Sequence, residues 1–218
     1  MEYCMGGEFK TIRNIILDMD GTLVNTAKIT VPSCQEAARK FGFTEKNSET
    51  ISLLIGWPGL EFYKRLYPEA SYSNIIKYAE EVEVLEKQYI KKLGRDFLYN
   101  GVWDLLMNLK SEGCFLALAS TGDTAHVETS LSSTGLYPFF DILKYDHADK
   151  PKMVKEIVDF RETGEFLILG DRFFDARAGK ENHIRTVHAG YGFGSIDEGN
   201  EFDVVVNDPS DLLTLLGI

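Results

Sequence analysis

The sequence predicts an α/β protein, a parallel sheet covered by helices, with a helical segment inserted after the first strand. Short apolar runs of strand length alternate with segments of helical spacing, which is typical of a parallel sheet with helices on both faces. This alternation stops between about residues 26 and 97, where helical patterns continue without a convincing strand. A chain of 218 residues is long enough for one medium-sized core with a smaller insert.

The expected strands are apolar runs bounded by turn residues. They lack the alternation of a half-exposed sheet, as Leu116-Ala117-Leu118-Ala119 shows, so both faces should be buried. They lie at 14–17, 115–119, 166–169, 185–188 and 203–206. Segments with apolar residues at helical spacing separate them, at 102–110, 124–132, 151–160, 175–181 and 211–215.

The insert is expected to be a small helical bundle. Its strongest helix should begin near Ser73, a plausible N-cap, and end at Gly94. Shorter helical pieces at 32–41, 49–55 and 60–66 are separated by glycine and proline. The predicted organisation is therefore a core made of 1–24 and 98–218, and a cap made of 25–97.

The charge and cysteine content exclude several classes of protein. With 23 Lys and Arg against 34 Asp and Glu, the net charge is −11, so nucleic acid and anionic membrane surfaces are poor partners. No apolar run approaches the roughly 20 residues that span a bilayer, and the first ten residues do not form a secretory signal. Cys4, Cys34 and Cys114 form no C-x-x-C pair, which indicates a reducing compartment. We expect a cytoplasmic protein.

Two acidic clusters follow strands of the predicted sheet. Asp18 and Asp20 come directly after the first strand, and Asp171 and Asp175 follow the strand at 166–169. Ligands of open parallel sheets bind at the carboxyl ends of the strands, so these side chains should converge. Carboxylates brought together repel one another unless a cation neutralises them, and Mg²⁺ would do so. Each cluster alone is also compatible with an ordinary polar turn.

Two further segments could bind a phosphate group near this point. Ser120 and Thr121 end the second apolar strand and offer hydroxyl groups and backbone N–H groups at the start of a helix. Lys150 stands before Pro151 at the start of the next helix and could supply a local cation in a strongly acidic chain. Lys152 is the alternative phosphate lysine.

These four segments resemble, in their order along the chain, the motifs of the haloacid dehalogenase-like (HAD) hydrolase superfamily. The run from Asp18 to Val24 looks like the first motif, and Ser120 stands where the second motif has its hydroxyl residue. Lys150 corresponds to the lysine of the third motif, and the run Gly170-Asp171-Arg172-Phe173-Phe174-Asp175 is similar to the fourth. The closest resemblance is to the phosphoglycolate phosphatase-like branch, which has a helical C1-type cap.

The resemblance implies a Rossmann-like core and a Mg²⁺-dependent phosphatase that forms an aspartyl-phosphate. In that mechanism Asp18 is the nucleophile and Asp20 the general acid and base. Ser120, Thr121 and Lys150 would bind the phosphoryl oxygens. The metal ligands would be Asp18, Asp20, Asp171 and Asp175.

The substrate implied is a small phosphorylated metabolite such as 2-phosphoglycolate, with a nucleoside 5′-monophosphate as an alternative. A phosphosugar mutase of the β-phosphoglucomutase kind needs the same motifs, and a non-catalytic phospho-receiver is a third hypothesis. Asn25 stands where relatives often have Asp. The protein is expected to act as a monomer or a homodimer.

Specificity is expected to lie in the cap. The turn Gly56-Trp57-Pro58-Gly59 could face the active site, and Lys64 or Arg65 could meet a substrate carboxylate. Core packing for Trp57 and solvent exposure for the two cations are the favoured interpretations. His126, His147, His183 and His188 show no metal-ligand spacing and are interpreted as structural or surface residues.

Overall fold

The computed structural model describes residues 8–57 and 59–218, and both Cys4 and Pro58 lie outside this part of the chain. The described residues form a parallel six-stranded sheet in the order β3-β2-β1-β4-β5-β6. The strands are β1 (Asn14–Leu17), β2 (Phe115–Ala119), β3 (Ile142–Lys144), β4 (Phe166–Gly170), β5 (Arg185–Ala189) and β6 (Val204–Val206). The strand order turns back at β1, so a ligand site is expected at its carboxyl end.

Helices cover both faces of the sheet. Ile15 and Leu17 of β1 contribute to one apolar core, while Ile16 between them contributes to another, because successive side chains of a strand point to opposite faces. The first face packs on α5 (Val102–Ser111), α6 (Thr124–Thr134) and α10 (Asp211–Leu216), and the second on α7 (Lys150–Arg161) and α8 (Phe173–Glu181). The short helices η1 (Gly94–Phe97), η2 (Tyr137–Phe139) and α9 (Ile196–Gly199) complete this part.

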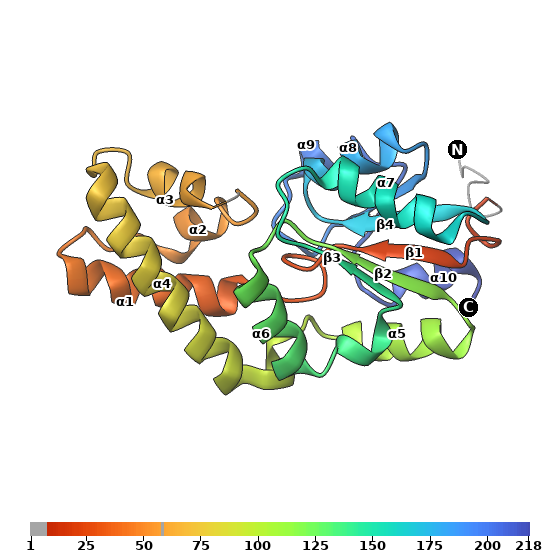
Figure 1. Cartoon of the computed structure of the whole chain (residues 1–218), viewed down its shortest axis with the longest axis horizontal. Helices are drawn as coiled ribbons and strands as arrows, with labels where there is room; N and C mark the ends of the chain where they lie inside the picture. The colour runs from red at the N-terminus through yellow and green to blue at the C-terminus, as the bar shows by residue number, and fades with distance from the viewer. Residues whose placement is uncertain (1–7, 58) are drawn as a thin grey trace.

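Four helices between β1 and η1 form a separate bundle, which we call the cap together with its loops. They are α1 (Ala27–Phe41), α2 (Ser48–Ser52), α3 (Leu60–Leu66) and α4 (Tyr72–Leu93). The cap has its own apolar core, in which Tyr67 and Tyr78 are fully buried. In Figure 1 it lies beyond the arrow tip of β1, at the carboxyl end of the strands.

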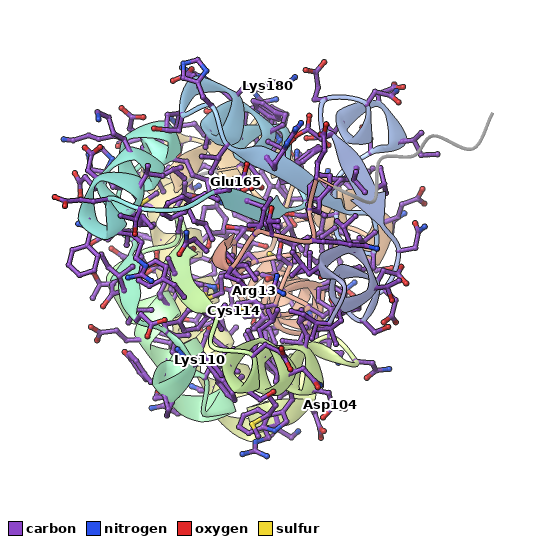
Figure 2. All side chains as sticks on the ribbon, turned by 90° about the vertical axis from the view of Figure 1, so that its right-hand side faces the viewer. Arg13, Asp104, Lys110, Cys114, Glu165 and Lys180 are labelled. Atoms are coloured by element: carbon purple, nitrogen blue, oxygen red, sulfur yellow. The ribbon has the colours of Figure 1, made fainter. Side chains whose placement is uncertain are left out.

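The opposite end of the sheet faces away from the cap. Figure 2 looks onto this end, where Arg13, Cys114 and Glu165 lie close together just before β1, β2 and β4. The backbone N–H of Phe115 donates a hydrogen bond to the carbonyl of Arg13 at 2.8 Å. All three strands therefore run from this end towards the cap.

The predicted fold class is confirmed, and the expected strands are present with end shifts of one residue at most. Strand β3 was not predicted, because it has only three residues and none of them is fully buried. Helix α1 starts five residues before Pro32 and continues through it, because Ile29 before the proline and Cys34 after it are both buried. Ser71, not Ser73, caps α4, and its hydroxyl accepts a hydrogen bond from the N–H of Asn74 at 3.3 Å.

Cys34 and Cys114 are both buried and carry free thiols. None of the helices in the described part of the chain combines the length and apolar character that a membrane crossing requires. The division into 1–24 with 98–218 and 25–97 stays a prediction.

Candidate active site

Three carboxylates meet at the carboxyl ends of β1 and β4. Asp18 follows β1, Asp171 follows β4, and Asp175 lies in the first turn of α8. One oxygen atom of each lies within 4.8 Å of the others. Their exposed fractions are 6%, 0% and 1%. The neighbouring parallel strands bring the first two together, as the sequence predicted.

Glycines hold the Asp171 side chain in place. The backbone of Gly21 has a φ of 82°, a conformation that residues other than glycine rarely adopt. A Cβ atom added at Gly21 or Gly192 would overlap the Asp171 carboxylate, and one at Gly194 would overlap its backbone carbonyl. The N–H of Phe193 donates a hydrogen bond of 2.7 Å to Oδ2 of Asp171. Backbone from two distant segments thus encloses this carboxylate.

The side chain of Lys150 enters the acidic cluster from the start of α7. Its ammonium group pairs with Asp18 and lies 2.5 Å from Oδ1 of Asp175, and only 4% of the residue is exposed. Burial, with the charges of Asp175 and Asp20, raises the pKa of Asp18 to about 7 despite Lys150. Burial and the charges of Asp18 and Asp175 also raise the pKa of Asp171 well above its ordinary value.

This cluster has the donor set that a hard divalent cation requires. Three carboxylates supply oxygen ligands, whereas a single lysine supplies the only cationic group in direct contact with them among the described residues. Oδ1 of Asp171 is fully buried and has no hydrogen-bond partner in the described part of the chain. A buried acceptor without a donor is costly, and a bound Mg²⁺ would remove that cost.

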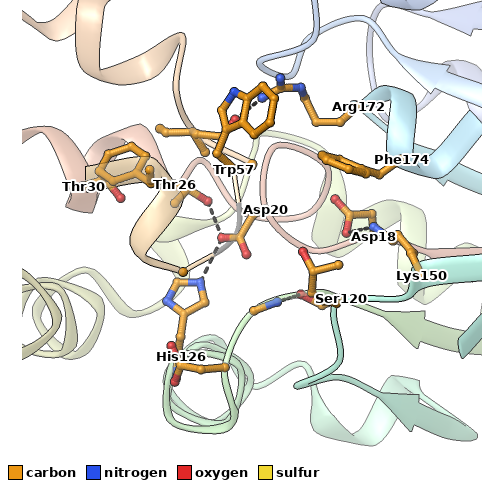
Figure 3. A pocket seen from close by; sticks show the side chains of 18 of the residues that line it. Asp18, Asp20, Thr26, Thr30, Trp57, Ser120, His126, Lys150, Arg172 and Phe174 are labelled. Atoms are coloured by element: carbon orange, nitrogen blue, oxygen red, sulfur yellow. Dashed lines mark hydrogen bonds and ion pairs between the residues drawn. The ribbon is translucent and has the colours of Figure 1, made fainter. Parts of the chain in front are cut away.

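Asp20 lies beside the cluster and has different partners. Its Oδ1 atom accepts a hydrogen bond of 2.5 Å from Thr26 and lies 2.9 Å from Nε2 of His126 (Figure 3). Burial alone would raise the pKa of Asp20, but the charge of His126 and these hydrogen bonds hold it below its ordinary value. In turn, Asp20 raises the pKa of His126 to about 9, although burial opposes this shift.

The position of His126 was not predicted from the sequence. Asp123 is the N-cap of α6, and its carboxylate accepts a hydrogen bond from the N–H of His126 at 3.0 Å. This N-cap contact places the imidazole on the first turn of a helix that begins at the same end of the sheet as Asp20. The sequence signal that could have placed His126 on the first turn of this helix is the N-cap residue Asp123 three positions before it.

The other predicted residues lie in the same place. A cavity of about 400 Å³ lies between the core and the cap. All seven predicted site residues line it: Asp18, Asp20, Ser120, Thr121, Lys150, Asp171 and Asp175. The Ser120 hydroxyl accepts a hydrogen bond of 3.1 Å from the N–H of Gly122. Lys152 is exposed on α7 and does not line the cavity.

The cap supplies the opposite wall. Trp57 packs against the apolar core of the cap and also lines the cavity, where its ring meets Phe174 edge-on with centroids 6.4 Å apart. Core packing, the favoured interpretation, is therefore only part of its role. The Arg172 guanidinium reaches across from the core and donates a hydrogen bond to the carbonyl of Ile55 (Figure 3). It also pairs with Glu198 at 3.0 Å.

Known proteins resemble this chain over nearly its whole length. Curated relatives include pyrophosphatase PpaX of Halalkalibacterium halodurans, 24% identical over 95% of this chain and 98% of its own length. PpaX of Listeria innocua is 26% identical over 94% of this chain and 96% of its own length.

Solved structures share the fold at lower identity. A predicted phosphoglycolate phosphatase from Haemophilus somnus superposes with a TM-score of 0.85 at 20% identity, covering 94% of this chain and 97% of that one. The CbbY protein of Rhodobacter sphaeroides, in complex with xylulose-(1,5)bisphosphate, gives 0.76 at 21% identity, covering 94% and 99%. The family model described as haloacid dehalogenase-like hydrolase matches residues 15–189. That match spans most of the chain, so this protein belongs to the haloacid dehalogenase-like hydrolases and is an enzyme of that family.

Proposed function

We propose that this enzyme is a Mg²⁺-dependent phosphatase that hydrolyses a small phosphate monoester through an aspartyl-phosphate on Asp18. The observation that carries the proposal is the set of contacts at Asp18. Its carboxylate is paired with buried Lys150, lies among the Asp171 and Asp175 carboxylates and opens onto the cavity between core and cap. A carboxylate in this position can attack a phosphorus atom while its neighbours hold the phosphoryl oxygens.

Lys150, Ser120 and Thr121 are the proposed phosphate ligands. Lys150 brings a full positive charge to a position that is almost inaccessible to water, where it interacts strongly with a phosphoryl oxygen. Ser120 is only 1% exposed and follows β2, the strand beside β1. These groups would neutralise the charge that develops on the oxygens in the transition state.

Asp20 is the proposed general acid and base. In the first step the leaving alcohol oxygen needs a proton, and in the second step the attacking water must lose one. The pKa of Asp20 is lowered and that of His126 is raised, so the proton of this pair resides on the imidazole. We assign to His126 the supply of this proton through Asp20 and its recovery when water attacks.

Mg²⁺ is the proposed cofactor. Asp18, Asp171 and Asp175 would hold it through their side chains, together with the backbone carbonyl of Asp20. A bound divalent cation would screen the charge of the Asp18 carboxylate from the phosphate dianion. The orphaned Oδ1 atom of Asp171 supports this assignment independently of the family relationship.

Two alternative reactions are compatible with the same residues. The curated relatives are named pyrophosphatases, which favours pyrophosphate as a second candidate substrate. A β-phosphoglucomutase from Clostridium difficile superposes with a TM-score of 0.72 at 19% identity, covering 92% of this chain and 93% of that one. A mutase on this fold would return the phosphoryl group to the sugar instead of passing it to water.

The test is turnover of p-nitrophenyl phosphate, pyrophosphate and glucose 1-phosphate with Mg²⁺ and with EDTA. Multiple turnovers of the aryl ester that stop with EDTA would support a phosphatase. Faster hydrolysis of pyrophosphate would favour the second candidate, and formation of glucose 6-phosphate would identify a mutase. Stoichiometric labelling of Asp18 without turnover would contradict all three.

A further inference from the structure

The cavity has a wall remote from the Asp18 cluster that differs sharply from it in composition, and this wall bears on the proposed phosphatase function. If the phosphoryl group of a substrate lies at Asp18, this wall would face the alcohol part of that substrate. Helix α4 of the cap contributes Glu83 and Glu86, and α3 contributes Phe62 and Tyr63. Trp57 adds a third aromatic ring from the loop before α3.

Acidic side chains outnumber free cationic ones along this wall. Besides Glu83 and Glu86, the core adds Asp123 and Asp146 near the same opening. Asp123 accepts a hydrogen bond from the backbone N–H of His126 at the start of α6, and Asp146 accepts one from the side-chain hydroxyl of Thr124 at 2.7 Å.

The cationic groups that line the cavity away from Lys150 already have partners. His126 is held by Asp20, and Arg172 by Glu198 and the carbonyl of Ile55. Nδ1 of His147 accepts a hydrogen bond from the N–H of Asp149 at 3.0 Å, and the residue is exposed at the cavity's rim. A second anionic group on a substrate would find no unengaged lysine or arginine among the described lining residues.

The cations of the cap lie outside the cavity. Lys64 and Arg65 were candidates to meet a substrate carboxylate, but both are exposed and neither lines the cavity. The Lys64 ammonium lies over Tyr72 at 5.7 Å from the ring centroid. Arg65 pairs with Glu61 at 2.9 Å, and its guanidinium carbon lies 3.6 Å from the centroid of the Trp57 ring, so this ring already has a cation on one face. The sequence interpretation of these two cations as solvent-exposed is confirmed.

Glu83 and Glu86 differ in their present contacts. Oε1 of Glu86 accepts a hydrogen bond of 2.5 Å from Thr30, which leaves its second oxygen available. Glu83 makes no hydrogen bond or ion pair with any other described residue. Glu83 is exposed and Glu86 is half-buried. Burial raises the pKa of both carboxyl groups and outweighs the opposing charges of Lys87 near Glu83 and of His126 near Glu86. A cation placed between the two carboxylates would favour their charged forms.

From this arrangement of carboxylates and an aromatic ring in one cavity, we infer that the substrate is the phosphate monoester of a small amino alcohol, with its ammonium group between Glu83, Glu86 and the ring of Tyr63. Carboxylates pair with an ammonium directly, and aromatic faces attract it through their quadrupole. The inference rests on the proposed function, because it assumes that the phosphoryl group lies at Asp18. It disfavours 2-phosphoglycolate and pyrophosphate, which carry a second anion.

Three two-carbon monoesters of nearly equal size test the inference: O-phosphoethanolamine, 2-hydroxyethyl phosphate and 2-phosphoglycolate. They present an ammonium, a hydroxyl and a carboxylate group to the same wall. We expect kcat/KM with Mg²⁺ to fall about tenfold or more at each step in that order, which corresponds to about 1.4 kcal/mol for each change of group. Hydrolysis of 2-phosphoglycolate with the same kcat/KM as 2-hydroxyethyl phosphate would overturn the inference. A kcat/KM for O-phosphoethanolamine that does not exceed that for 2-hydroxyethyl phosphate would also overturn it.

The aryl ester separates this inference from the proposed function. If p-nitrophenyl phosphate is hydrolysed while O-phosphoethanolamine is not preferred among the three esters, the phosphatase stands and the amino alcohol is wrong. If pyrophosphate is hydrolysed with a higher kcat/KM than O-phosphoethanolamine, the amino alcohol is also wrong. If neither the aryl ester nor any of the three monoesters is hydrolysed, both fail.

Variants of α4 locate the determinant. In Glu83→Gln and in Glu83→Gln/Glu86→Gln, we expect the ratio of kcat/KM for the ammonium ester to that for the hydroxyl ester to fall by about tenfold. Glu80→Gln is the matched control, since Glu80 lies on the same helix, is exposed and does not line the cavity. The single variant keeps the test valid if the double variant folds poorly. An equal fall in the Glu80 variant, or no fall in the others, would overturn the assignment.

Discussion

Nε2 of His126 lies 2.9 Å from Oδ1 of Asp20, although 106 positions separate the two residues in the chain. The pair joins the loop after β1 to the first turn of α6. The pKa values of its two members shift in opposite directions, that of Asp20 downwards and that of His126 upwards to about 9, as expected for an ion pair shielded from water.

This pair should make stability depend on pH. The pKa of His126 in the folded protein exceeds its ordinary value of 6.5, so its contribution is complete below pH 6.5 and is lost as the pH rises through 9. The shift corresponds to roughly 3 kcal/mol. The free energy of unfolding should be measured in urea with EDTA for wild type and for His126→Gln. The stability advantage of wild type over the variant should be larger at pH 6 than at pH 10 by that amount. A difference that is equal at both pH values would contradict the ion pair.

Asp18→Asn should abolish activity and leave the fold intact. The amide keeps the volume of the side chain but is not a nucleophile, so we expect the rate with p-nitrophenyl phosphate to fall by about 10³ or more. Because burial raises the pKa of Asp18, its ionisation costs stability above neutral pH. Without metal at pH 8, the variant should therefore melt no lower than wild type. Retention of more than about a tenth of the wild-type rate would contradict the role of Asp18.

Asp20→Asn should separate leaving groups. Esters of alkyl alcohols need a proton on the departing oxygen, whereas p-nitrophenolate leaves without one. We expect kcat for 2-hydroxyethyl phosphate to fall at least about tenfold further than kcat for p-nitrophenyl phosphate. Equal losses with both esters would rule out proton donation by Asp20.

Lys150→Met should unfold the protein more readily and remove activity. The variant leaves the buried carboxylates of Asp18 and Asp175 without their cation, a change that typically costs about 3–5 kcal/mol. Lys152→Met is the matched control, because Lys152 is exposed two residues away on the same helix, and it should change stability by less than about 0.5 kcal/mol. Loss of phosphatase activity in the Lys152 variant alone would reverse the assignment of the phosphate lysine.

Mg²⁺ should stabilise the folded protein. A ligand at 100 times its dissociation constant adds about 2.7 kcal/mol, which raises the melting temperature of a chain of this size by several degrees. Differential scanning fluorimetry should show this rise for wild type and a smaller one for Asp171→Asn, which removes the charge of an enclosed carboxylate. The control is KCl at the same ionic strength as the Mg²⁺ solution. The same rise with KCl would argue against a specific metal site.

The fold was predictable where burial dictates composition. The four main strands have both faces covered, so they appear as continuous apolar runs, and their ends were placed within one residue. Strand β3 lies at the edge of the sheet, and its three residues are only partly buried. It has no such apolar signal. Pro32 misled the placement of α1, because packing on both sides of the proline outweighs the lost backbone hydrogen bond.

The candidate site was predictable where residues follow strands. Asp18, Ser120 and Asp171 all come directly after strands of one parallel sheet, so topology alone brings them to one edge. His126, Glu83 and Glu86 lie within helices, and their direction depends on how α4 and α6 pack against the core. A single sequence holds no record of that packing, which explains why the acidic cap wall emerged only in three dimensions.

The glycine enclosure of Asp171 has a consequence for how this protein tolerates change. Gly21, Gly192 and Gly194 approach Asp171 so closely that no methyl group fits at any of them. A random mutagenesis screen for inactive clones should recover alanine or serine at these three codons, even though they would supply no reactive group. Evolutionary drift in this enzyme is then constrained by missing side chains as much as by those that are present.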